Sequence, residues 1–303
     1  MKILVLGGGF IGQAVHKHLQ DYHNSRLVTQ KEVDYTLTSR HKSSKSLIEF
    51  LNLADPAYDI VVNCSGYTGV PNVDGCETNK EDCWLYNVKA PQRTTRLINQ
   101  YGNAPVIHIS SGCIYQGDED FTEEDVPNFG VYNEDSSFYS RSKHAGEMLL
   151  KDLDCYILRI RMPICGYPHD KNLLVKLMKY ERVIDKMNSI TRVEDLAVAV
   201  EKICENRHEI PPGIFNVVNT GSVTIHEVLD ALRKHGLGRA SWVKVEEKEL
   251  DLKCKRSNCT LNTDKLKKYR LMLPHAKYAL DQCVMGLKYK WEMEYGIGGV
   301  GAF

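Results

Sequence analysis

The chain has 303 residues, 43% hydrophobic and 26% charged, and Lys plus Arg equal Asp plus Glu at 39 each. A neutral balance gives no electrostatic reason to expect a nucleic-acid or membrane partner. No apolar run approaches the roughly 18 residues of a membrane span, and the short run from Ile3 to Leu6 lacks a small-residue cleavage site. We therefore expect a soluble, cytoplasmic α/β protein with one large unit, or one unit plus a smaller lobe.

Strand-like and helix-like segments alternate through the first half of the chain. Short apolar runs predict strands at residues 2–7, 25–30, 58–65, 104–111 and 155–162. Apolar residues at helical spacing predict helices at 11–20, 43–54, 82–102 and 138–151. This alternation indicates an α/β fold with a Rossmann-like, doubly wound parallel sheet.

The pattern loosens after Pro163. Helices are predicted at 172–183, 191–206 and 223–236, and a strand at 213–219. We place an NADP-binding Rossmann domain at 1–160, to which elements at about 187–220 return, and a mainly substrate-binding lobe at 161–303.

A glycine loop follows the first predicted strand. Gly7, Gly9 and Gly12 form G-x-G-x-x-G directly before a predicted helix. Glycine lets the backbone approach a pyrophosphate, and the helix N-terminus offers free N–H groups and the positive end of a dipole. The loop therefore predicts a dinucleotide site, made by Gly7, Gly9, Phe10, Ile11 and Gly12.

The end of the second predicted strand bears on which dinucleotide is bound. An NAD site usually has an acid there, to hold the ribose 2′-hydroxyl. This chain has no acid between Val28 and Glu32, and Lys31 could meet a 2′-phosphate. NADP(H) is therefore favoured; the alternative is that Lys31 is a solvated side chain at a strand end.

Residues 139–143 carry the sequence Y-x-x-x-K on a predicted helix, where positions i and i+4 share a face. The ammonium of Lys143 can lower the phenol pKa of Tyr139 and touch the nicotinamide ribose, and the phenol can then donate a proton to a carbonyl. The strand at 104–111 ends in Ser111, at the sheet edge where ligands bind in such folds. We predict that Ser111, Tyr139 and Lys143 are catalytic and that the last two also contact the cofactor.

Together these motifs resemble an extended short-chain dehydrogenase/reductase and, more narrowly, the dTDP-4-dehydrorhamnose reductase group. The similarity is strongest to the bifunctional UDP-4-keto-6-deoxyglucose 3,5-epimerase/4-reductases of plant and giant-virus rhamnose synthesis. The family usually has G-x-x-G-x-x-G, whose first position here falls on Leu6, and close relatives have threonine at Ser111. The stretches that carry the resemblance are GYTGVPNVDGCE (66–77), SSGCIY (110–115), FTEEDVPNF (121–129), FYSRSK (138–143), LRIRMPI (158–164), MNSIT (187–191) and KRSNCTLNTDKLKK (255–268).

The resemblance implies further site residues and a homodimer. It implies that the cofactor is lined by Cys64, Ser65, Gly66 and Tyr67, and that the substrate is approached by Asn87, Arg161, Arg256 and Asn258. An amide on the helix surface is the alternative for Asn87, and an internal ion pair is the alternative for Arg161.

The resemblance also implies epimerisation at C3 and C5, with a cysteine and a lysine as the acid/base pair. Cys113 and Lys176 occupy those positions, and protons α to a C4 ketone are acidic enough for a thiolate or an amine to remove. The alternatives are a small core residue for Cys113 and a solvated helix position for Lys176. The ten cysteines form no CxxC pair, so no metal is predicted.

The predicted activity is NADPH-dependent reduction of C4 in a UDP-linked 4-keto-6-deoxy hexose, after epimerisation, to give UDP-L-rhamnose. Two alternatives stay open. The substrate could be a UDP-2-acetamido-2,6-dideoxy-4-keto hexose. The chain could also be a non-catalytic dinucleotide-binding regulatory subunit, like that of methionine adenosyltransferase; the intact Ser111, Tyr139 and Lys143 argue against this.

Overall fold

Residues 1–29, 49, 51, 58–239 and 241–295 are described in the computed structural model of the chain. Six parallel strands form the central sheet of these residues, in the order β11-β6-β4-β3-β1-β2. The strands are β1 (Lys2–Leu6), β2 (Asn24–Val28), β3 (Ile60–Asn63), β4 (Val106–Ser111), β6 (Cys155–Ile160) and β11 (Gly213–Asn216). The order reverses between β1 and β3, and ligands bind at such a switch point. The predicted Rossmann-like parallel sheet is confirmed.

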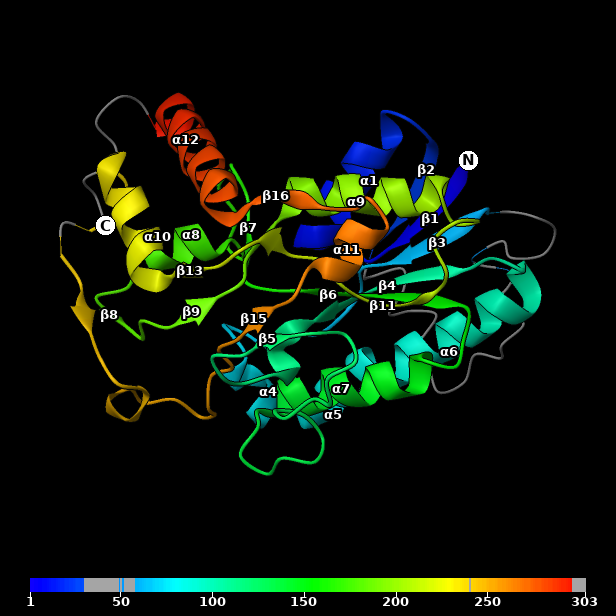
Figure 1. Ribbon diagram of the computed structural model, residues 1–303, viewed down its shortest axis with the longest axis horizontal. Coiled ribbons are helices and arrows are strands. Elements are labelled where there is room, and N and C mark those ends of the chain that lie inside the picture. The colour runs from blue at the N-terminus through cyan, green and yellow to red at the C-terminus, as the bar shows by residue number, and fades with distance from the viewer. Residues whose placement is uncertain (30–48, 50, 52–57, 240, 296–303) are drawn as a thin grey trace.

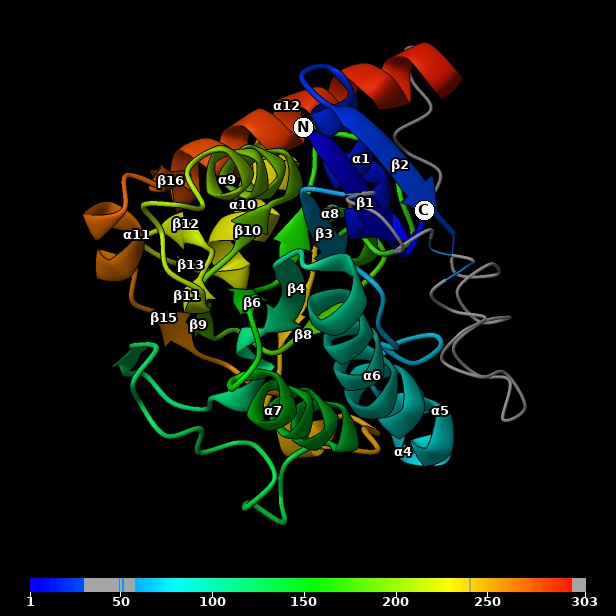
Figure 2. The same cartoon turned by 90° about the vertical axis from the view of Figure 1, so that its right-hand side faces the viewer.

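Two layers of helices cover the sheet (Figures 1 and 2). One layer holds α1 (Phe10–Gln20) and α9 (Val193–Glu205), and the other holds α4 (Asp74–Thr78), α5 (Lys80–Trp84), α6 (Ala90–Leu97) and α7 (Phe138–Leu150). Successive strand residues face opposite layers. In β1, Ile3 and Val5 join the core on the α1 side, whereas Leu4 and Leu6 join the core on the α6 side. Burial on both faces explains why these strands are continuous apolar runs.

The helix predicted at 82–102 is a continuous helical run from Lys80 to Gly102, in which Leu85–Lys89 and Ile98–Gly102 are π-helical. The helix predicted at 43–54 falls outside the described residues except at Glu49 and Leu51, both helical.

A second core lies beyond the carboxyl ends of the strands, at the left in Figure 1. It is built from α8 (Leu173–Leu177), α10 (Ile225–Lys234) and α12 (Ala276–Tyr295). The helix predicted at 172–183 is too long: the chain turns after Leu177, and Arg182–Val183 forms a strand instead. The long helix α12 was not predicted.

Short strands pair outside the central sheet and tie distant segments together. The pairs are β7 (Pro163–Ile164) with β10 (Thr191–Arg192), β12 (Asn219–Thr220) with β16 (Leu273–His275), β9 (Met187–Asn188) with β13 (Val223–Thr224), β8 (Arg182–Val183) with β14 (Val243–Lys244), and β5 (Asp120–Phe121) with β15 (Thr260–Leu261). The remaining helices of the described residues are 3₁₀ turns at Gly112–Ile114 and Glu247–Glu249, and α11 (Asp264–Lys268). The strand predicted at 213–219 is thus divided between β11 and β12.

Elements from the second half of the chain are divided between the sheet core and the second core. α9, β11, α11 and β16 pack against the sheet core, while α8, α10 and α12 form the second core. The division at residue 160 stays a prediction. Within the described ranges, no helix is both long and apolar enough to cross a membrane.

Candidate active site

The glycine loop turns tightly between β1 and α1. Gly7 has φ +96°, in the region that favours glycine, and a Cβ there would lie 2.7 Å from the backbone N of Ser65. A Cβ on Gly12 would lie 1.8 Å from the carbonyl oxygen of Gly7. The missing family glycine at Leu6 therefore does not prevent the turn, because Gly7 makes it.

The N-terminus of α1 offers an open cradle. A Cβ on Gly9 would meet nothing within 4 Å, and the first turn has no side-chain cap and no acidic residue. The ring of Phe10 stacks on that of His169, with centroids 4.5 Å apart, which brings the lobe to this loop. Free backbone N–H groups beside open space fit a pyrophosphate. Lys31, predicted at the 2′-phosphate, lies outside the described residues.

Asn87 holds the loop after β3 against the helices. Its Oδ1 accepts from the N–H of Tyr67 at 2.8 Å, and its Nδ2 donates to the carbonyl of Tyr67 at 2.8 Å and to Ser142 at 2.9 Å. The residue is 1% exposed. The alternative of a surface amide is therefore wrong, and the occupied amide positions Gly66 and Tyr67 instead of presenting free donors to a substrate.

The neighbouring loop residues lie at the switch point. Ser65 donates its N–H to Oδ1 of Asn63 at 3.0 Å. Cys64 is half-buried, and its Cβ lies 3.2 Å from where a Cβ on Gly12 would be. Gly66 lies near both Asn87 and the Nζ of Lys143. Segments after β1 and β3 thus converge, and the cofactor lining that the resemblance implies stays a prediction.

Ser111, Tyr139 and Lys143 come together at the carboxyl edge of β4. Ser111 ends that strand and accepts from the N–H of Cys113 at 3.2 Å, and Tyr139 and Lys143 share one face of α7. The hydroxyls of Ser111 and Tyr139 interact. Lys143 donates to the carbonyl of Ile109 at 3.2 Å.

Burial governs the protonation of this group. It raises the pKa of the Tyr139 phenol, with the Cys113 thiol adding to the rise and the hydrogen bond with Ser111 opposing it. Burial also lowers the pKa of Lys143 to about 8, against the opposing charge of Glu147. The net shift is therefore opposite to the predicted lowering, because burial of Tyr139 has the largest effect on its pKa. A raised pKa keeps the phenol protonated, which a proton donor requires, but it also makes the phenol a weaker acid.

Cys113 lies against Arg161, which follows β6. The guanidinium Nη1 is 3.0 Å from Sγ of Cys113, and Nη2 donates to Oδ1 of Asn188 at 2.7 Å and to the carbonyl of Ser257. Nε of Arg161 is buried without a hydrogen-bond partner among the described residues. No carboxylate of these residues pairs with Arg161, so the alternative of an internal ion pair is wrong. The Cys113 sulfur is therefore in direct contact with a buried cation.

The segment 255–259 lies across this cluster. Asn258 accepts from Nδ2 of Asn188 at 3.2 Å and gives its carbonyl to the N–H of Gly117 at 2.9 Å. Arg256 makes a two-bond ion pair with Asp74, at 2.7 and 2.6 Å, and this pair lowers the pKa of Asp74. The guanidinium of Arg256 is partly exposed, but Asp74 accepts hydrogen bonds from both of its terminal nitrogens.

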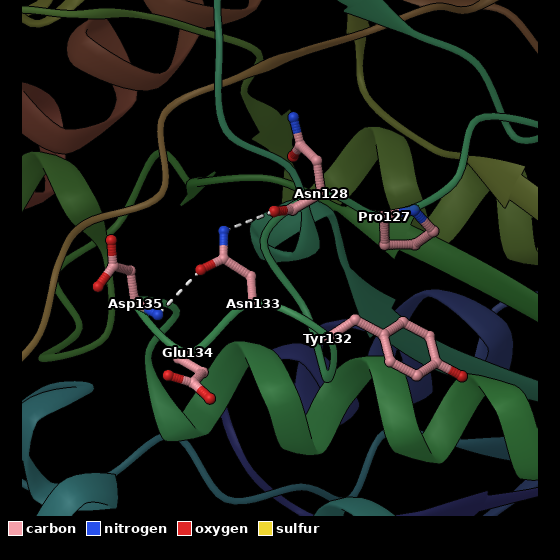
Figure 3. A pocket seen from close by; sticks show the side chains of 6 residues that line it. All are labelled: Pro127, Asn128, Tyr132, Asn133, Glu134 and Asp135. Atoms are coloured by element: carbon pink, nitrogen blue, oxygen red, sulfur yellow. Dashed lines mark hydrogen bonds between the residues drawn. The ribbon is translucent and has the colours of Figure 1, made fainter.

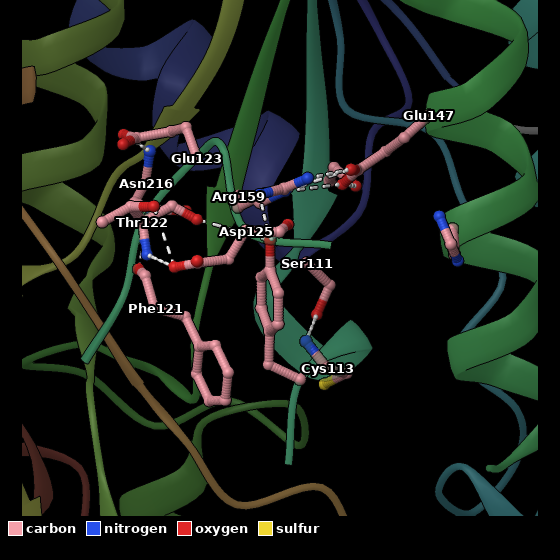
Figure 4. Close-up of polar contacts among 12 residues, drawn as sticks. Ser111, Cys113, Phe121, Thr122, Glu123, Asp125, Glu147, Arg159 and Asn216 are labelled. Atoms are coloured by element: carbon pink, nitrogen blue, oxygen red, sulfur yellow. Dashed lines mark hydrogen bonds and ion pairs between the residues drawn. The ribbon is translucent and has the colours of Figure 1, made fainter. Parts of the chain in front are cut away.

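A buried network supports the site from behind (Figure 4). Arg159 pairs with Glu147 at 2.8 Å and donates to the hydroxyl of Tyr115 at 2.9 Å. That hydroxyl donates to the carbonyl of Asp125 at 2.8 Å, and the ring stacks on Phe121 with centroids 4.5 Å apart. The stretch FTEEDVPNF is thereby fixed beside Ser111 and Cys113.

Lys176 lies in α8, half-buried. Burial lowers its pKa, and the nearby charge of Lys171 lowers it further. Among the described residues its Nζ makes no hydrogen bond or ion pair, and no interaction joins it to Cys113. The Nζ of Lys176 is not among the buried atoms without a partner, so the alternative of a solvated position stays open and its role stays a prediction.

A surface hollow lies away from these residues. It has a volume of about 510 Å³ and lies on the loop before α7, lined by Pro127, Asn128, Tyr132, Asn133, Glu134 and Asp135 (Figure 3). None of these is a predicted site residue, and the reactive groups do not face it.

Sequence reasoning missed the residues that hold the substrate side together. Asn188 is 1% exposed and joins Arg161 to Asn258, and Asp74 holds Arg256. Both lie in stretches that carry the family resemblance, MNSIT and GYTGVPNVDGCE, and this was the only signal for them.

A parallel sheet with a glycine loop at its switch point and a Tyr–Lys pair at its carboxyl edge defines the short-chain dehydrogenase/reductase class. The RmlD substrate binding domain family model matches residues 1–288, and the chain belongs to this family. The predicted relationship is confirmed.

Two relatives from Arabidopsis thaliana match most of the chain. One is a bifunctional dTDP-4-dehydrorhamnose 3,5-epimerase/dTDP-4-dehydrorhamnose reductase, 31% identical over 80% of this chain and 81% of that protein. The other is a trifunctional UDP-glucose 4,6-dehydratase/UDP-4-keto-6-deoxy-D-glucose 3,5-epimerase/UDP-4-keto-L-rhamnose-reductase, 29% identical over 88% of this chain. The chain spans only 39% of the length of this second relative.

Solved structures agree with the fold. A UDP-rhamnose synthase of Acanthamoeba polyphaga mimivirus superposes with a TM-score of 0.80 at 25% identity, covering 95% of this chain and 99% of that one. A dTDP-4-dehydrorhamnose reductase of Bacillus anthracis, in complex with NADP, gives 0.77 at 20% identity, covering 94% and 98%. The predicted class, a nucleotide-sugar reductase, is the class of these relatives.

Proposed function

We propose that the protein uses NADPH to reduce the C4 ketone of a nucleotide-linked 4-keto-6-deoxy hexose after epimerising its ring, giving UDP-L-rhamnose. The observation that carries this proposal is the meeting of Ser111, Tyr139 and Lys143 beside an open glycine loop, with Cys113 held against Arg161 next to them. The names of the relatives support the same substrate class.

In the reduction, Tyr139 donates its phenol proton to O4 of the sugar while Ser111 hydrogen-bonds that oxygen. NADPH, when bound, supplies the hydride that C4 receives. Lys143 holds its positive charge beneath Tyr139 and Gly66, where it can contact the cofactor ribose and stabilise the phenolate that forms. The ketone thus gains one hydride and one proton and becomes an alcohol.

In the epimerisation, the C4 ketone acidifies the protons on C3 and C5. One basic group removes such a proton, and an acid on the opposite ring face returns one. Cys113, held against Arg161 at 3.0 Å, and Lys176, whose pKa is lowered by burial, are the proposed pair. Arg256 and Asn258 are proposed to approach the nucleotide, since arginine suits phosphate contacts.

UDP is proposed as the nucleotide, although one relative is named for dTDP. A 2-acetamido sugar and a non-catalytic regulatory role are the alternatives. The retained Ser111, Tyr139 and Lys143 favour catalysis over the regulatory role. The homodimer implied by the family stays a prediction, which light scattering would check.

The test is NADPH oxidation with UDP-4-keto-6-deoxyglucose, followed by product NMR in D2O. We expect UDP-L-rhamnose with deuterium at C3 and C5, and we expect Cys113→Ala to stop the deuterium uptake. If only the 2-acetamido analogue is turned over, the substrate is the 2-acetamido sugar. No oxidation with either sugar would overturn the reductase proposal.

A further inference from the structure

Two histidines and two glutamates cluster away from the active site. They are His18 in α1, His23 in the turn before β2, and Glu201 and Glu205 in α9. His23 directly precedes β2, whereas the glycine loop directly follows β1, the parallel neighbour of β2. The cluster therefore lies at the amino edge of the sheet, opposite the glycine loop, where α1 and α9 lie side by side (Figure 1).

His23 is the member that indicates a ligand. Its side chain is 8% exposed, and its Nε2 is buried without a hydrogen-bond partner in the described part of the chain. This atom lies 3.9 Å from Oε1 of Glu201 and 3.8 Å from Oε1 of Glu205, too far for hydrogen bonds. A buried ring nitrogen that lacks a partner costs free energy, and here it points between two carboxylates.

The spacing suits a small tetrahedral cation. Nitrogen and carboxylate oxygen ligands lie about 2.0–2.2 Å from zinc, and at tetrahedral angles such ligands are roughly 3.3–3.6 Å from one another. The ligand atoms of His23, Glu201 and Glu205 all lie within 4.8 Å of one another. A slight inward movement of the glutamates would bring them to coordinating distance.

His18 and the helix ends support a cation in the same place. Nε2 of His18 lies 2.8 Å from Oε2 of Glu201, which leaves Oε1 turned toward His23. Such a second partner orients a metal-binding carboxylate. α1 and α9 both end near the cluster, and the negative ends of their dipoles favour a positive ion.

We propose that His23, Glu201 and Glu205 bind one Zn²⁺ ion, with water as the fourth ligand and His18 orienting Glu201. Imidazole and carboxylate ligands are a set that zinc accepts. The ion fastens α9 to the turn between α1 and β2 and so is structural. The expectation of no metal rested on cysteine spacing, which carries no information about a histidine–glutamate site.

The test uses the full-length, metal-free protein with its thiols kept reduced by a phosphine. Calorimetry with ZnCl₂ should give one equivalent bound, and zinc should raise the melting temperature. His23→Ala should abolish this binding, and His18→Ala should weaken it about 10- to 100-fold. His226→Ala, which removes an exposed histidine paired with Asp230 in α10, is the matched control and should bind zinc normally.

Cobalt separates this site from the cysteines. Co²⁺ bound by nitrogen and oxygen should show visible d–d bands without a thiolate charge-transfer band. A thiolate band, or unchanged zinc affinity in both His23→Ala and His18→Ala, would overturn the proposal. So would the absence of binding to the wild type. If His23→Ala does not fold, Glu205→Gln replaces it, because the Glu205 side chain is 50% exposed.

Discussion

The two sides of the active site are built differently. On the cofactor side, the key groups sit at ends of regular elements: Gly7 after β1, Ser111 at the end of β4, and Tyr139 and Lys143 on one face of α7. On the substrate side, Arg161 is held by one hydrogen bond each to Asn188 and Ser257, which lie far from it in the sequence. The regular backbone positions the residues of the cofactor side, whereas side-chain hydrogen bonds position Arg161 on the substrate side.

This difference predicts where mutations act. A change on the cofactor side should alter chemistry or cofactor affinity while leaving the fold intact, since the backbone there is held by the sheet. A change in the network behind the substrate side should alter stability and activity together.

Tyr139→Phe should lower kcat for NADPH oxidation about 10²- to 10⁴-fold, because it removes the proton donor. The fold should survive, since the ring still fills its place. Tyr132→Phe is the control, because Tyr132 is 73% exposed. Steady-state kinetics would check both, and more than a tenth of wild-type kcat in Tyr139→Phe would rule out this donor.

Glu147→Gln should lower the free energy of unfolding by about 3–5 kcal/mol, because it leaves the buried charge of Arg159 without its counter-ion. Urea denaturation measures this. Glu292→Gln, which breaks the exposed pair with Lys288, should change the same free energy by less than about 1 kcal/mol. Equal losses in the two variants would contradict a buried supporting network.

The same difference explains what the sequence could predict. Helical spacing and strand ends are local patterns, so the glycine loop, Ser111 and the Tyr139–Lys143 pair were found. Asn188 and Ser257 hold Arg161 across 27 and 96 residues, and no local pattern encodes such contacts.

Errors in the predicted lobe have similar causes. The helix α12 has apolar side chains on all sides, with Tyr278 and Met285 exposed while Leu280 and Leu287 are buried, so no single stripe marks it. The predicted helix at 172–183 was cut short because Arg182–Val183 pairs with a distant strand. Tertiary pairing overrode local periodicity there.

Arg161→Lys should lower kcat/KM about 10- to 100-fold, since hydrogen bonds to charged groups contribute about 1.5–3 kcal/mol. A lysine cannot reach Cys113, Asn188 and Ser257 at once. Deuterium uptake should fall more than hydride transfer, because Arg161 touches Cys113. Arg233→Lys, at an exposed position, is the control. Equal losses in deuterium uptake and hydride transfer would show that Arg161 does not act through Cys113.

The pH dependence should follow Lys143. Its pKa is lowered to about 8 by burial, so it loses its proton at a lower pH than an exposed lysine. If the ammonium is required, kcat/KM should be level below the pKa and fall about tenfold per pH unit above it. Tyr139, whose pKa is raised, would stay protonated through this range. A profile that stays level to pH 10 would show that the charge on Lys143 is not needed.

Gly9→Ala tests whether the open cradle belongs to the cofactor. The backbone at Gly9 has φ −82° and ψ −169°, which alanine adopts without strain, and a Cβ there would meet nothing within 4 Å. The free energy of unfolding should therefore change by less than about 1 kcal/mol. A methyl group in the cradle should nevertheless oppose a pyrophosphate, so the Kd for NADPH should rise at least about tenfold, or about 1.4 kcal/mol. Gly12→Ala is the contrasting variant. Its Cβ would overlap the carbonyl oxygen of Gly7, so the free energy of unfolding should fall. If Gly9→Ala binds NADPH with wild-type affinity in a fluorescence titration, the cofactor does not lie over α1, and the cofactor side would have lost its main support.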